Sequence, residues 1–323
     1  MRRAIAADFA CLPGGPVRVI VTSDARLPDD PGPWTIARIA AGDDPSRLRD
    51  LARKADSTVL IAPETSGVLA SLTRELEQAG ARLLGSTAEA VELAADKARL
   101  AARLHELSID TPPTRTIVPG AGLPHDAKYP AVLKPNDGAG SVDTFYLTDA
   151  KSLPVCARGL PVAVLQPFVP GTPMSASFLI GQGGQSWPIG VATQRMTIRE
   201  GRFEYCGGTV PAPCRDALPQ LKPAVEAIDG LRGFVGVDFI WNAKKRHATI
   251  LEINPRPTTS YVGLSRLAPP GLLARAWLAA CEPLARDTET LAGLAECIHG
   301  KQGFVSFSAN GELSYDHVGA FVT

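Results

Sequence analysis

Two apolar segments in the last third of the chain carry polar side chains that an ordinary core strand would lack. The sequence predicts strands over Phe234–Trp241 and Ala248–Ile253, joined by a polar turn. Paired as an antiparallel hairpin, these strands bring Asp238 close to Glu252 and Asn254. Two carboxylates and an amide oxygen are hard ligands of the kind that Mg²⁺ takes in proteins. The hairpin therefore predicts a magnesium site.

The same hairpin has a plainer interpretation. Because side chains alternate along a strand, Ile250, Glu252 and Asn254 are expected on one face. Arg256 follows between two prolines, which restrict its backbone. In the plainer interpretation Asp238 caps a turn and Glu252 forms an ion pair with Arg256. The combination of two acids, an amide and an arginine in so short a stretch favours the metal site.

Two lysines and a glycine-rich loop lie upstream of the hairpin. Lys134 ends a predicted strand and is held extended by the proline that follows it. The next loop contains Gly138, Gly140 and Ser141, and glycine permits backbone conformations that turn N–H groups toward an anion. A tight turn without a ligand is the alternative for this loop, and a solvated helix surface is the alternative for Lys97.

These motifs taken together resemble those of the ATP-grasp ligases. GVDF followed by LEINPRP, a Lys-Pro pair followed closely by GAGS, and an upstream Asp-Lys pair stand in that family's order. The resemblance implies that Asp238, Glu252 and Asn254 hold Mg²⁺, or Mn²⁺ in its place, against the phosphates of ATP. It also implies that Lys97 contacts the α-phosphate, that Lys134 grips the α- and β-phosphates, and that the glycine-rich loop is a lid.

The segment Val162–Val169 resembles the hinge between the two halves of the family's ATP site. The resemblance implies that Gln166 meets the adenine edge and that the backbone at Phe168 and Val169 completes its recognition. Many relatives carry an acid shortly after the hinge glycine, where it binds the ribose. This sequence has none there, so either the Ser175 hydroxyl takes that role or the ribose is held more loosely.

In the family that these motifs resemble, a substrate carboxylate attacks the γ-phosphate of ATP, and an amine then attacks the resulting acylphosphate. The resemblance implies catalytic roles for Lys134 and for Arg256, which would steady the acylphosphate. Arg195, near a predicted strand end, is a third candidate and would meet phosphate or a substrate carboxylate. A plain surface position is the alternative for Arg195.

The short three-part layout and the LEINPRPTTS string look most like ligases that join the γ-carboxylate of glutamate to the amine of tyramine in methanofuran biosynthesis. This implies ATP, glutamate and an aromatic amine, tyramine or tyrosine, as the substrates. A ligase for another amino-acid or peptide pair is an alternative. A non-catalytic ATP-binding protein is a lesser one, since all three metal ligands are present.

The elements that position these residues follow from hydrophobic patterning. Patterning predicts the α/β (α+β) class with a Rossmann-like N-terminal domain over residues 1–86. The family resemblance implies that two ATP-grasp subdomains, over residues 87–165 and 166–323, follow and clasp ATP. Residues 86–107 are predicted as one helix, and residues 203–213 as a glycine-broken loop that could line the substrate site. Further predictions are strands over 17–22, 58–62 and 81–84, helices over 45–54 and 66–79, and a C-terminal hairpin around an Asn-Gly turn.

Composition limits the partners. The 33 basic and 33 acidic residues give a net charge of zero, which disfavours nucleic acid or an anionic membrane as the main partner. No stretch approaches the length of a membrane span. The six cysteines show no Cys-x-x-Cys pair, so a zinc site is not expected. Dispersed thiols of this kind predict a reducing, cytoplasmic location. Whether the chain forms a homodimer is left open.

Overall fold

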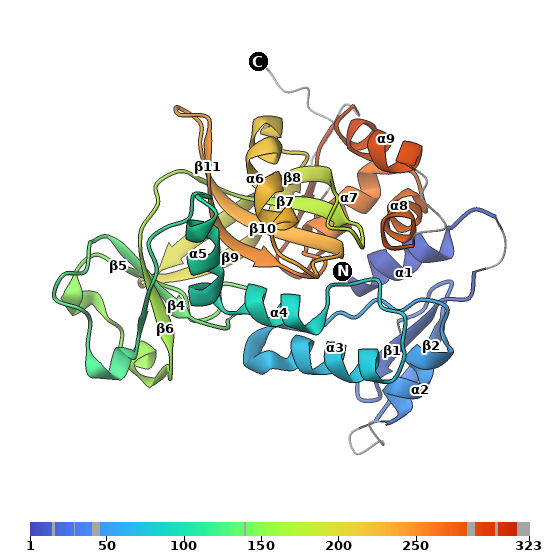
Figure 1. Cartoon of the computed structure of the whole chain (residues 1–323), viewed down its shortest axis with the longest axis horizontal. Helices are drawn as coiled ribbons and strands as arrows, with labels where there is room; N and C mark the ends of the chain where they lie inside the picture. The colour runs from blue at the N-terminus through green and yellow to red at the C-terminus, as the bar shows by residue number, and fades with distance from the viewer. Residues whose placement is uncertain are drawn as a thin grey trace.

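The computed structural model describes residues 1–14, 17–28, 30–40, 46–138, 140–282, 288–300 and 303–314. Figure 1 shows a small N-terminal unit packed beside a larger unit that is built on one long sheet. The first helix of the chain contacts two helices within residues 260–281, so segments far apart in the sequence lie against each other.

The N-terminal unit has a two-stranded parallel sheet with helices beside it. Its elements are α1 (Arg2–Ala10), β1 (Ile20–Asp24), β2 (Thr35–Ile39), α2 (Ser46–Lys54), the 3-10 turn η1 (Thr65–Gly67) and α3 (Val68–Gln78). The two predicted helices are confirmed, and the first predicted strand lies slightly later in the chain. The other two predicted strands are wrong as strands, because only Thr58 and Leu83 pair, in a single parallel bridge.

The segment predicted as one helix over residues 86–107 is two helices, α4 (Ala88–Ala95) and α5 (Lys97–Glu106). They meet at Asp96, whose backbone is extended (φ −86°, ψ 98°) and whose carboxylate caps α5 through a hydrogen bond of 3.0 Å. Aspartate suits this position because its side chain accepts a hydrogen bond from a free N–H of the first helical turn. The break places Lys97 at the start of α5 and buries its side chain.

The larger unit is built on an eleven-stranded antiparallel sheet with the neighbour order β11-β10-β7-β8-β9-β5-β4-β6-β3, and β12 and β13 attach beside β9. The strands are β3 (Arg115–Ile117), β4 (Ala131–Pro135), β5 (Phe145–Leu147), β6 (Ala163–Pro167), β7 (Thr172–Ile180), β8 (Ser186–Arg199), β9 (Arg202–Val210), β10 (Gly233–Asn242), β11 (His247–Asn254), β12 (Val305–Phe307) and β13 (Leu313–Ser314). The helices are α6 (Leu218–Glu226), α7 (Ser260–Leu267), α8 (Leu272–Cys281) and α9 (Thr288–His299).

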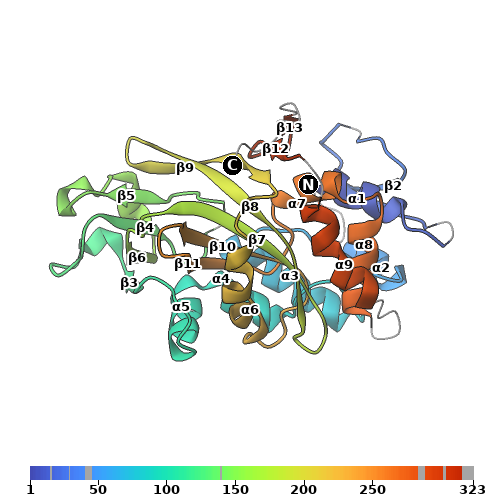
Figure 2. The same cartoon turned by 90° about the horizontal axis from the view of Figure 1, so that it is seen from above.

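Helices cover the two faces of this sheet unequally (Figures 1 and 2). On one face Val237 and Phe239 pack with apolar side chains of α4, α5 and α6. On the opposite face Phe234 packs with α7 and α8. Because side chains alternate along β10, Asp238 and Ile240 point to the same face as Phe234, where they line a pocket. The functional side chains therefore stand on the part of the sheet that the helices leave open.

Residues 203–213, predicted as a loop, mostly form β9, which pairs with β8 and β12. The prediction was wrong because the two glycines permit close strand approach here instead of ending the strand. A Cβ at Gly207 would lie 2.0 Å from the carbonyl oxygen of Phe307, and one at Gly208 would lie 2.1 Å from that of Thr193. The C-terminal hairpin predicted from its Asn-Gly turn is confirmed as β12–β13.

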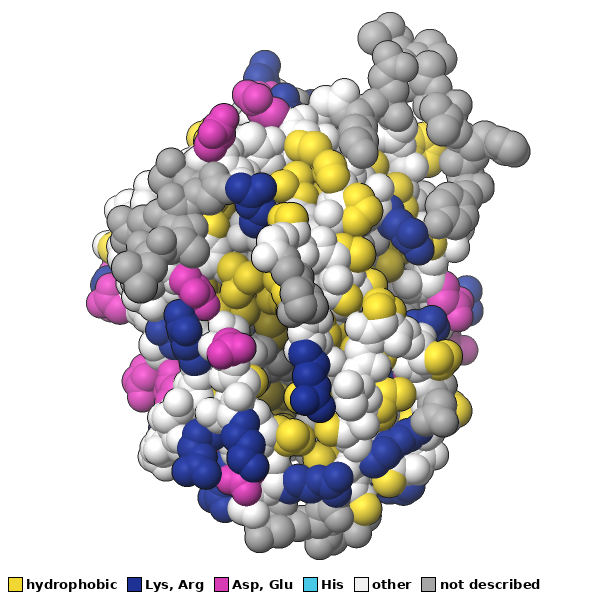
Figure 3. Space-filling model, turned by 90° about the vertical axis from the view of Figure 1, so that its right-hand side faces the viewer, with side chains coloured by type: hydrophobic (Ala, Val, Ile, Leu, Met, Phe, Trp, Pro, Cys, Tyr) yellow, Lys and Arg dark blue, Asp and Glu magenta, His cyan; other side chains and the backbone are white. Residues whose placement is uncertain are grey.

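The small parallel unit followed by a large antiparallel sheet with flanking helices confirms the predicted α/β (α+β) class. On the face shown in Figure 3, basic and acidic side chains are interspersed over the part that is not grey. Among the described residues, no helix has the length and apolar character needed to cross a membrane.

Candidate active site

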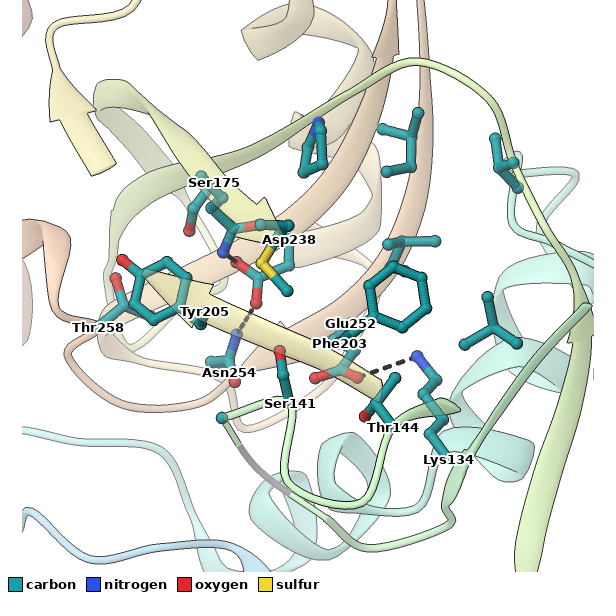
Figure 4. A pocket seen from close by; sticks show the side chains of 18 of the residues that line it. Lys134, Ser141, Thr144, Ser175, Phe203, Tyr205, Asp238, Glu252, Asn254 and Thr258 are labelled. Atoms are coloured by element: carbon teal, nitrogen blue, oxygen red, sulfur yellow. Dashed lines mark hydrogen bonds and ion pairs between the residues drawn. The ribbon is translucent and has the colours of Figure 1, made fainter. Parts of the chain in front are cut away.

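A pocket of about 530 Å³ opens on the uncovered part of the sheet (Figure 4). It is lined by most of the predicted site residues: Lys134, Gly140, Ser141, Gln166, Phe168, Val169, Ser175, Asp238, Glu252, Asn254 and Arg256. Lys97 and Gly138 line a small cavity that shares Glu252 and Asn254 with the pocket. The structure thus brings together every predicted site residue except Arg195.

Arg195 lines neither cavity. Its side chain is exposed, and its guanidinium donates a hydrogen bond of 2.6 Å to the carbonyl oxygen of Cys206. The preceding residue, Gln194, lines the pocket instead and donates to Asp238. In this structure Arg195 therefore has the surface position that was the alternative to a catalytic role, and Gln194 is a site residue that the sequence did not reveal.

A β-bulge in the β10–β11 hairpin sets the direction of the acidic side chains. Asp238 pairs with Glu252, but the next residue, Phe239, pairs with Ile250, so Leu251 is inserted without a partner. The insertion reverses the alternation of faces. Ile250 is buried in the core, whereas Leu251 and Glu252 both line the pocket. The expectation that Ile250 shares a face with Glu252 is wrong, and the expected juxtaposition of Asp238 and Glu252 is confirmed.

Gly236 makes room for the loop that follows β11. It lies on the same face of β10 as Asp238, and a Cβ at Gly236 would be 2.4 Å from Cγ2 of Thr258. The hydroxyls of Thr258 and Ser260 lie 2.7 Å apart. The loop is therefore pressed onto the sheet, with its hydroxyl groups beside the acidic pair (Figure 4).

Asp238 is held by two amide side chains. Gln194 Nε2 donates to Oδ1 and Asn254 Nδ2 donates to Oδ2, each at 3.1 Å. Burial, and then the negative charge of Glu252, raise the pKa of Asp238 to about 6. A cation beside Asp238 would offset both the burial and the charge of Glu252 that disfavour its ionised form.

Glu252 is paired with two buried lysines. Its Oε1 lies 2.9 Å from Lys134 Nζ and 3.8 Å from Lys97 Nζ, and both lysines are almost fully buried. Burial alone would raise the pKa of Glu252, but Lys134 and then Lys97 outweigh it and hold this pKa below its ordinary value. Burial also lowers the pKa of Lys97. In this structure Glu252 is thus the anion that balances the cations predicted to bind phosphates.

The glycine-rich loop is held over the site from two sides. The Lys97 N–H donates to the carbonyl oxygen of Asn136 at 3.1 Å, and Lys97 Nζ donates to the carbonyl oxygen of Gly138. From the N-terminal unit, the Ser66 N–H donates to the carboxylate of Asp137 at 3.0 Å. Movement of this loop would require all of these contacts to change.

The predicted hinge residues line the pocket from β6 and the segment after it. Gln166 is buried, and its Nε2 donates to Thr114 Oγ1 at 2.8 Å, which fixes the orientation of the amide. The Phe168 N–H donates to the carbonyl oxygen of Pro130 at 2.9 Å. The ring of Phe168 meets Tyr146 edge-on, with centroids 5.1 Å apart. These contacts fix the hinge without closing the pocket.

Ser175 lies opposite Asp238 in the pairing of β7 with β10. Figure 4 shows it on the far side of the acidic pair from Lys134. Its hydroxyl is therefore beside the predicted metal ligands. The ribose contact suggested for Ser175 stays a prediction.

Arg256 is paired with an acid that the sequence did not single out. Its guanidinium lies 2.8 Å from the carboxylate of Glu64, and Glu64 is only 5% exposed. Glu64 belongs to the N-terminal unit, at the start of the η1 turn. The plainer interpretation, a pair between Glu252 and Arg256, is wrong because Glu64 holds the arginine and the lysines hold Glu252.

The donor set fits a magnesium ion. Asp238 and Glu252 face each other across the hairpin, Asn254 adds an amide, and burial and then the charge of Glu252 raise the pKa of Asp238. Within the described ranges no group of three or more His, Cys, Asp or Glu side chains could hold a metal ion. Because Mg²⁺ takes six ligands, the three side chains Asp238, Glu252 and Asn254 would leave coordination positions for the oxygens of a phosphate ligand.

Comparison with known proteins identifies the family to which this fold and pocket belong. A family model described as an ATP-grasp domain matches residues 94–260, more than half of the chain. The chain belongs to the ATP-grasp family. A model described as a pre-ATP-grasp domain matches residues 17–91. The antiparallel sheet and the N-terminal unit are thus the ATP-grasp fold with its pre-ATP-grasp domain, and ATP-grasp proteins bind ATP, typically with Mg²⁺.

Curated relatives include the tyramine–L-glutamate ligase of Methanocaldococcus fervens, 31% identical over 68% of this chain and 65% of that protein. The tyramine–L-glutamate ligase of Methanocaldococcus jannaschii is 30% identical over 65% of this chain and 58% of that protein. The chain thus spans less than two thirds of the length of either relative. Among solved ATP-grasp structures, the biotin carboxylase domain of the 2-oxoglutarate carboxylase from Hydrogenobacter thermophilus, crystallised with MgADP and bicarbonate, matches with a TM-score of 0.65. That match covers 94% of this chain and 70% of the other at 16% identity.

Proposed function

We propose that this chain is an ATP-dependent, ADP-forming carboxylate–amine ligase that acts through an acylphosphate. The observation that carries the proposal is the gathering of Asp238, Glu252, Lys134 and Arg256 on one pocket of an ATP-grasp fold. The acids can hold a metal, the lysine can hold phosphates, and the arginine can stabilise an acyl oxygen. A protein that only binds ATP would need Arg256 only as the partner of the buried Glu64.

In this proposal the nucleotide lies along the pocket from the hinge to the acidic pair. Gln166, oriented by Thr114, meets the adenine edge together with the backbone at Phe168 and Val169. Lys134 and Lys97 contact the phosphates, which requires both lysines to exchange their present partners for phosphate oxygens. The net charge around the two lysines changes little in this exchange, because a phosphate oxygen replaces the Glu252 carboxylate beside each ammonium group.

Asp238, Glu252 and Asn254 would hold Mg²⁺, which when bound neutralises charge on the ATP phosphates. Mn²⁺ has the same preference for oxygen ligands and is expected to substitute.

The chemical step begins with an oxygen of the substrate carboxylate, which attacks the γ-phosphorus as the bond to the ADP oxygen breaks. Arg256, which lines the pocket, would stabilise the charge that develops on the acyl oxygen. The amine nitrogen then attacks the acyl carbon, the bond from that carbon to the phosphate oxygen breaks, and the proton lost by the amine passes to the released phosphate. A carboxylate is a poor electrophile until its oxygen leaves as phosphate, which is why ATP is consumed.

For the substrates we propose glutamate, through its γ-carboxylate, and tyramine or a closely related aromatic amine. The two curated relatives, named for this pair of substrates, support the choice. A different amino-acid or peptide pair is the second candidate, since the match covers less than two thirds of those relatives.

We also propose that the chain divides into an N-terminal domain over residues 1–86 and two ATP-grasp subdomains over residues 87–165 and 166–323.

A screen of nucleotide products tests the proposal. The protein is incubated with ATP and Mg²⁺, with single amino acids, single amines and their pairs, and ADP and AMP are quantified separately. ADP release only with glutamate plus tyramine is the expected result. ADP release with another pair would move the proposal to the second candidate. AMP as the product, or no nucleotide turnover with any pair, would contradict it.

A further inference from the structure

One turn of the N-terminal unit reaches the candidate active site at two points. Glu64, at the start of the η1 turn, pairs with Arg256, which lines the pocket. Two residues later, the Ser66 N–H donates to the carboxylate of Asp137 in the glycine-rich loop at 3.0 Å. Figure 1 shows α3, which follows this turn, side by side with α4. A segment within the pre-ATP-grasp match of residues 17–91 therefore contacts both the arginine and the loop predicted to cover the phosphates.

The backbone of this turn has an uncommon conformation. Ser66 has φ 57° and ψ 24°, and Gly67 has φ 68° and ψ 15°, so two successive residues are left-handed. The left-handed region is unfavourable for a residue that carries a Cβ, and such residues persist where the surrounding structure holds them. Backbone strain of this kind gathers at functional sites, which makes the turn a candidate for a role in the chemistry.

The ion pair between the turn and the pocket is incomplete. Arg256 Nη2 donates to Glu64 Oε2 at 2.8 Å, and Nη1 donates to the carbonyl oxygen of Pro257 at 3.2 Å. Within the described part of the chain, Arg256 Nε and Glu64 Oε1 are buried and have no hydrogen-bond partner. A pair that served only packing would gain from the two parallel hydrogen bonds that a guanidinium and a carboxylate can form. The unpaired atoms indicate that more than stability sets the geometry of this pair.

Arg256 needs a support outside its own segment. The prolines on both sides restrict its backbone, but its long side chain would lose conformational entropy on taking one position. The pair with Glu64, which is 5% exposed, orders the guanidinium in the folded protein before a substrate binds. Each terminal nitrogen of the guanidinium carries a second N–H, which leaves donors for an acyl oxygen in the pocket. A group ordered in advance stabilises developing charge without further loss of freedom.

We propose that Glu64 is a positioning residue for the acyl-transfer step. It holds the Arg256 guanidinium at the pocket, so the N-terminal unit supplies part of the active site. Glu64 does not line the large pocket itself and therefore acts through Arg256. The inference rests on the proposed function, because it concerns the step in which Arg256 takes part.

A double-mutant cycle tests this role. ADP release with glutamate and tyramine is measured for the unaltered protein, Glu64→Gln, Arg256→Ala and the double variant. Glutamine has the shape of glutamate but lacks its charge. We expect kcat to fall about tenfold in Glu64→Gln and about 100-fold in Arg256→Ala, with no further fall in the double variant. The KM for ATP should not change in Glu64→Gln. If another pair of substrates supports ADP release, the same cycle is run with that pair.

Chemical rescue is a second measurement, and it does not depend on the folding of the single Glu64→Gln variant. Guanidinium chloride, at concentrations too low to unfold the protein, should restore part of the activity of Arg256→Ala, because the ion can bind beside Glu64. In the double variant, which lacks both charges of the pair, half-maximal rescue should need at least about tenfold more guanidinium.

Glu77→Gln is the matched control for contact between the two units. Glu77 also belongs to the N-terminal unit, and its carboxylate lies 3.9 Å from the guanidinium of Arg232 in the larger unit. Neither residue lines the pocket or the small cavity beside it. The variant should therefore keep kcat within about twofold of that of the unaltered protein.

Four results would overturn the inference alone. These are an unchanged kcat in Glu64→Gln, losses that multiply in the double variant, equal rescue with and without the Glu64 charge, and a loss in Glu77→Gln as large as that in Glu64→Gln. No ADP release by the unaltered protein with any pair of amino acid and amine would overturn the proposed function and, with it, this inference.

Discussion

Replacing Glu252 with glutamine should separate two roles of this side chain. In the structure its Oε1 lies 2.9 Å from Lys134 Nζ and 3.8 Å from Lys97 Nζ. At an effective dielectric constant of about 20, these distances correspond to attractions of about 6 and about 4 kcal/mol before desolvation is subtracted. The variant leaves two buried ammonium groups without their anion. Loss of one partner of a buried pair typically costs about 3–5 kcal/mol, and since the Glu252 side chain is 24% exposed we expect about 3 kcal/mol.

The assay combines thermal unfolding with turnover. Without nucleotide, Glu252→Gln should unfold several degrees below the unaltered protein. ADP in the presence of EDTA should raise the melting temperature of the variant more than that of the unaltered protein, because phosphates replace the missing anion. Turnover with Mg²⁺ should fall by at least about 100-fold, since a metal ligand is lost. Glu226→Gln is the matched control, because it breaks the partly exposed pair with Lys222 and should cost less than about 1 kcal/mol.

Either of two outcomes would refute this reasoning. A Glu252→Gln variant as stable as the unaltered protein without nucleotide would show that the lysines do not depend on Glu252 for charge balance. Near-normal turnover would remove Glu252 from the metal site.

Other predictions test separate parts of the pocket. Lys134→Ala should raise the KM for ATP about tenfold or more, and an unchanged ATP dependence would remove this lysine from the phosphate site. Thr114→Val, which frees the Gln166 amide, should reduce the preference for ATP over GTP in a competition assay, and an undiminished preference would exclude the hinge role. Arg256→Ala should lower kcat about 100-fold or more while ADP affinity, measured by calorimetry, stays the same; weakened ADP binding would place the arginine at the nucleotide. Burial lowers the pKa of His299 to about 4. As pH falls from about 6.5 to about 4, the imidazole of His299 takes up a proton in the unfolded chain but not in the folded chain. The free energy of unfolding should therefore decrease by at most about 3 kcal/mol over this range, and it should decrease less in the His299→Gln variant. If the free energy of unfolding of His299→Gln had the same pH dependence as that of the unaltered protein, His299 would not be the cause.

The hairpin and the ATP site could be predicted because their signals are local. The alternation of apolar and acidic residues gave the pairing of Asp238 with Glu252, and short strings around Lys134 and Arg256 marked the family. Hydrophobic patterning predicted the α/β character of the N-terminal unit, and the family resemblance implied the rest of the fold. Such signals depend only on residues close together in the sequence.

What could not be predicted depends on tertiary contacts or on single-residue irregularities. The inserted Leu251 reverses the faces of β11, and no periodicity announces it. Glu64 meets Arg256 from a distant part of the chain. Gly207 looks like a strand breaker but serves the close approach of β12, and Phe307 reaches the pocket only through that pairing. Asp96 preceding Lys97 was a readable helix cap, and an aspartate within a long helical pattern is the signal that could have located this break.

Oxygen transfer tests the central claim most directly. Glutamate labelled with ¹⁸O in its γ-carboxylate is incubated with ATP, Mg²⁺, tyramine and the protein, and the inorganic phosphate is examined by ³¹P NMR. If the pocket activates the carboxylate as an acylphosphate, each phosphate released with ADP carries one ¹⁸O from glutamate. Unlabelled phosphate, with amide product still forming, would contradict it.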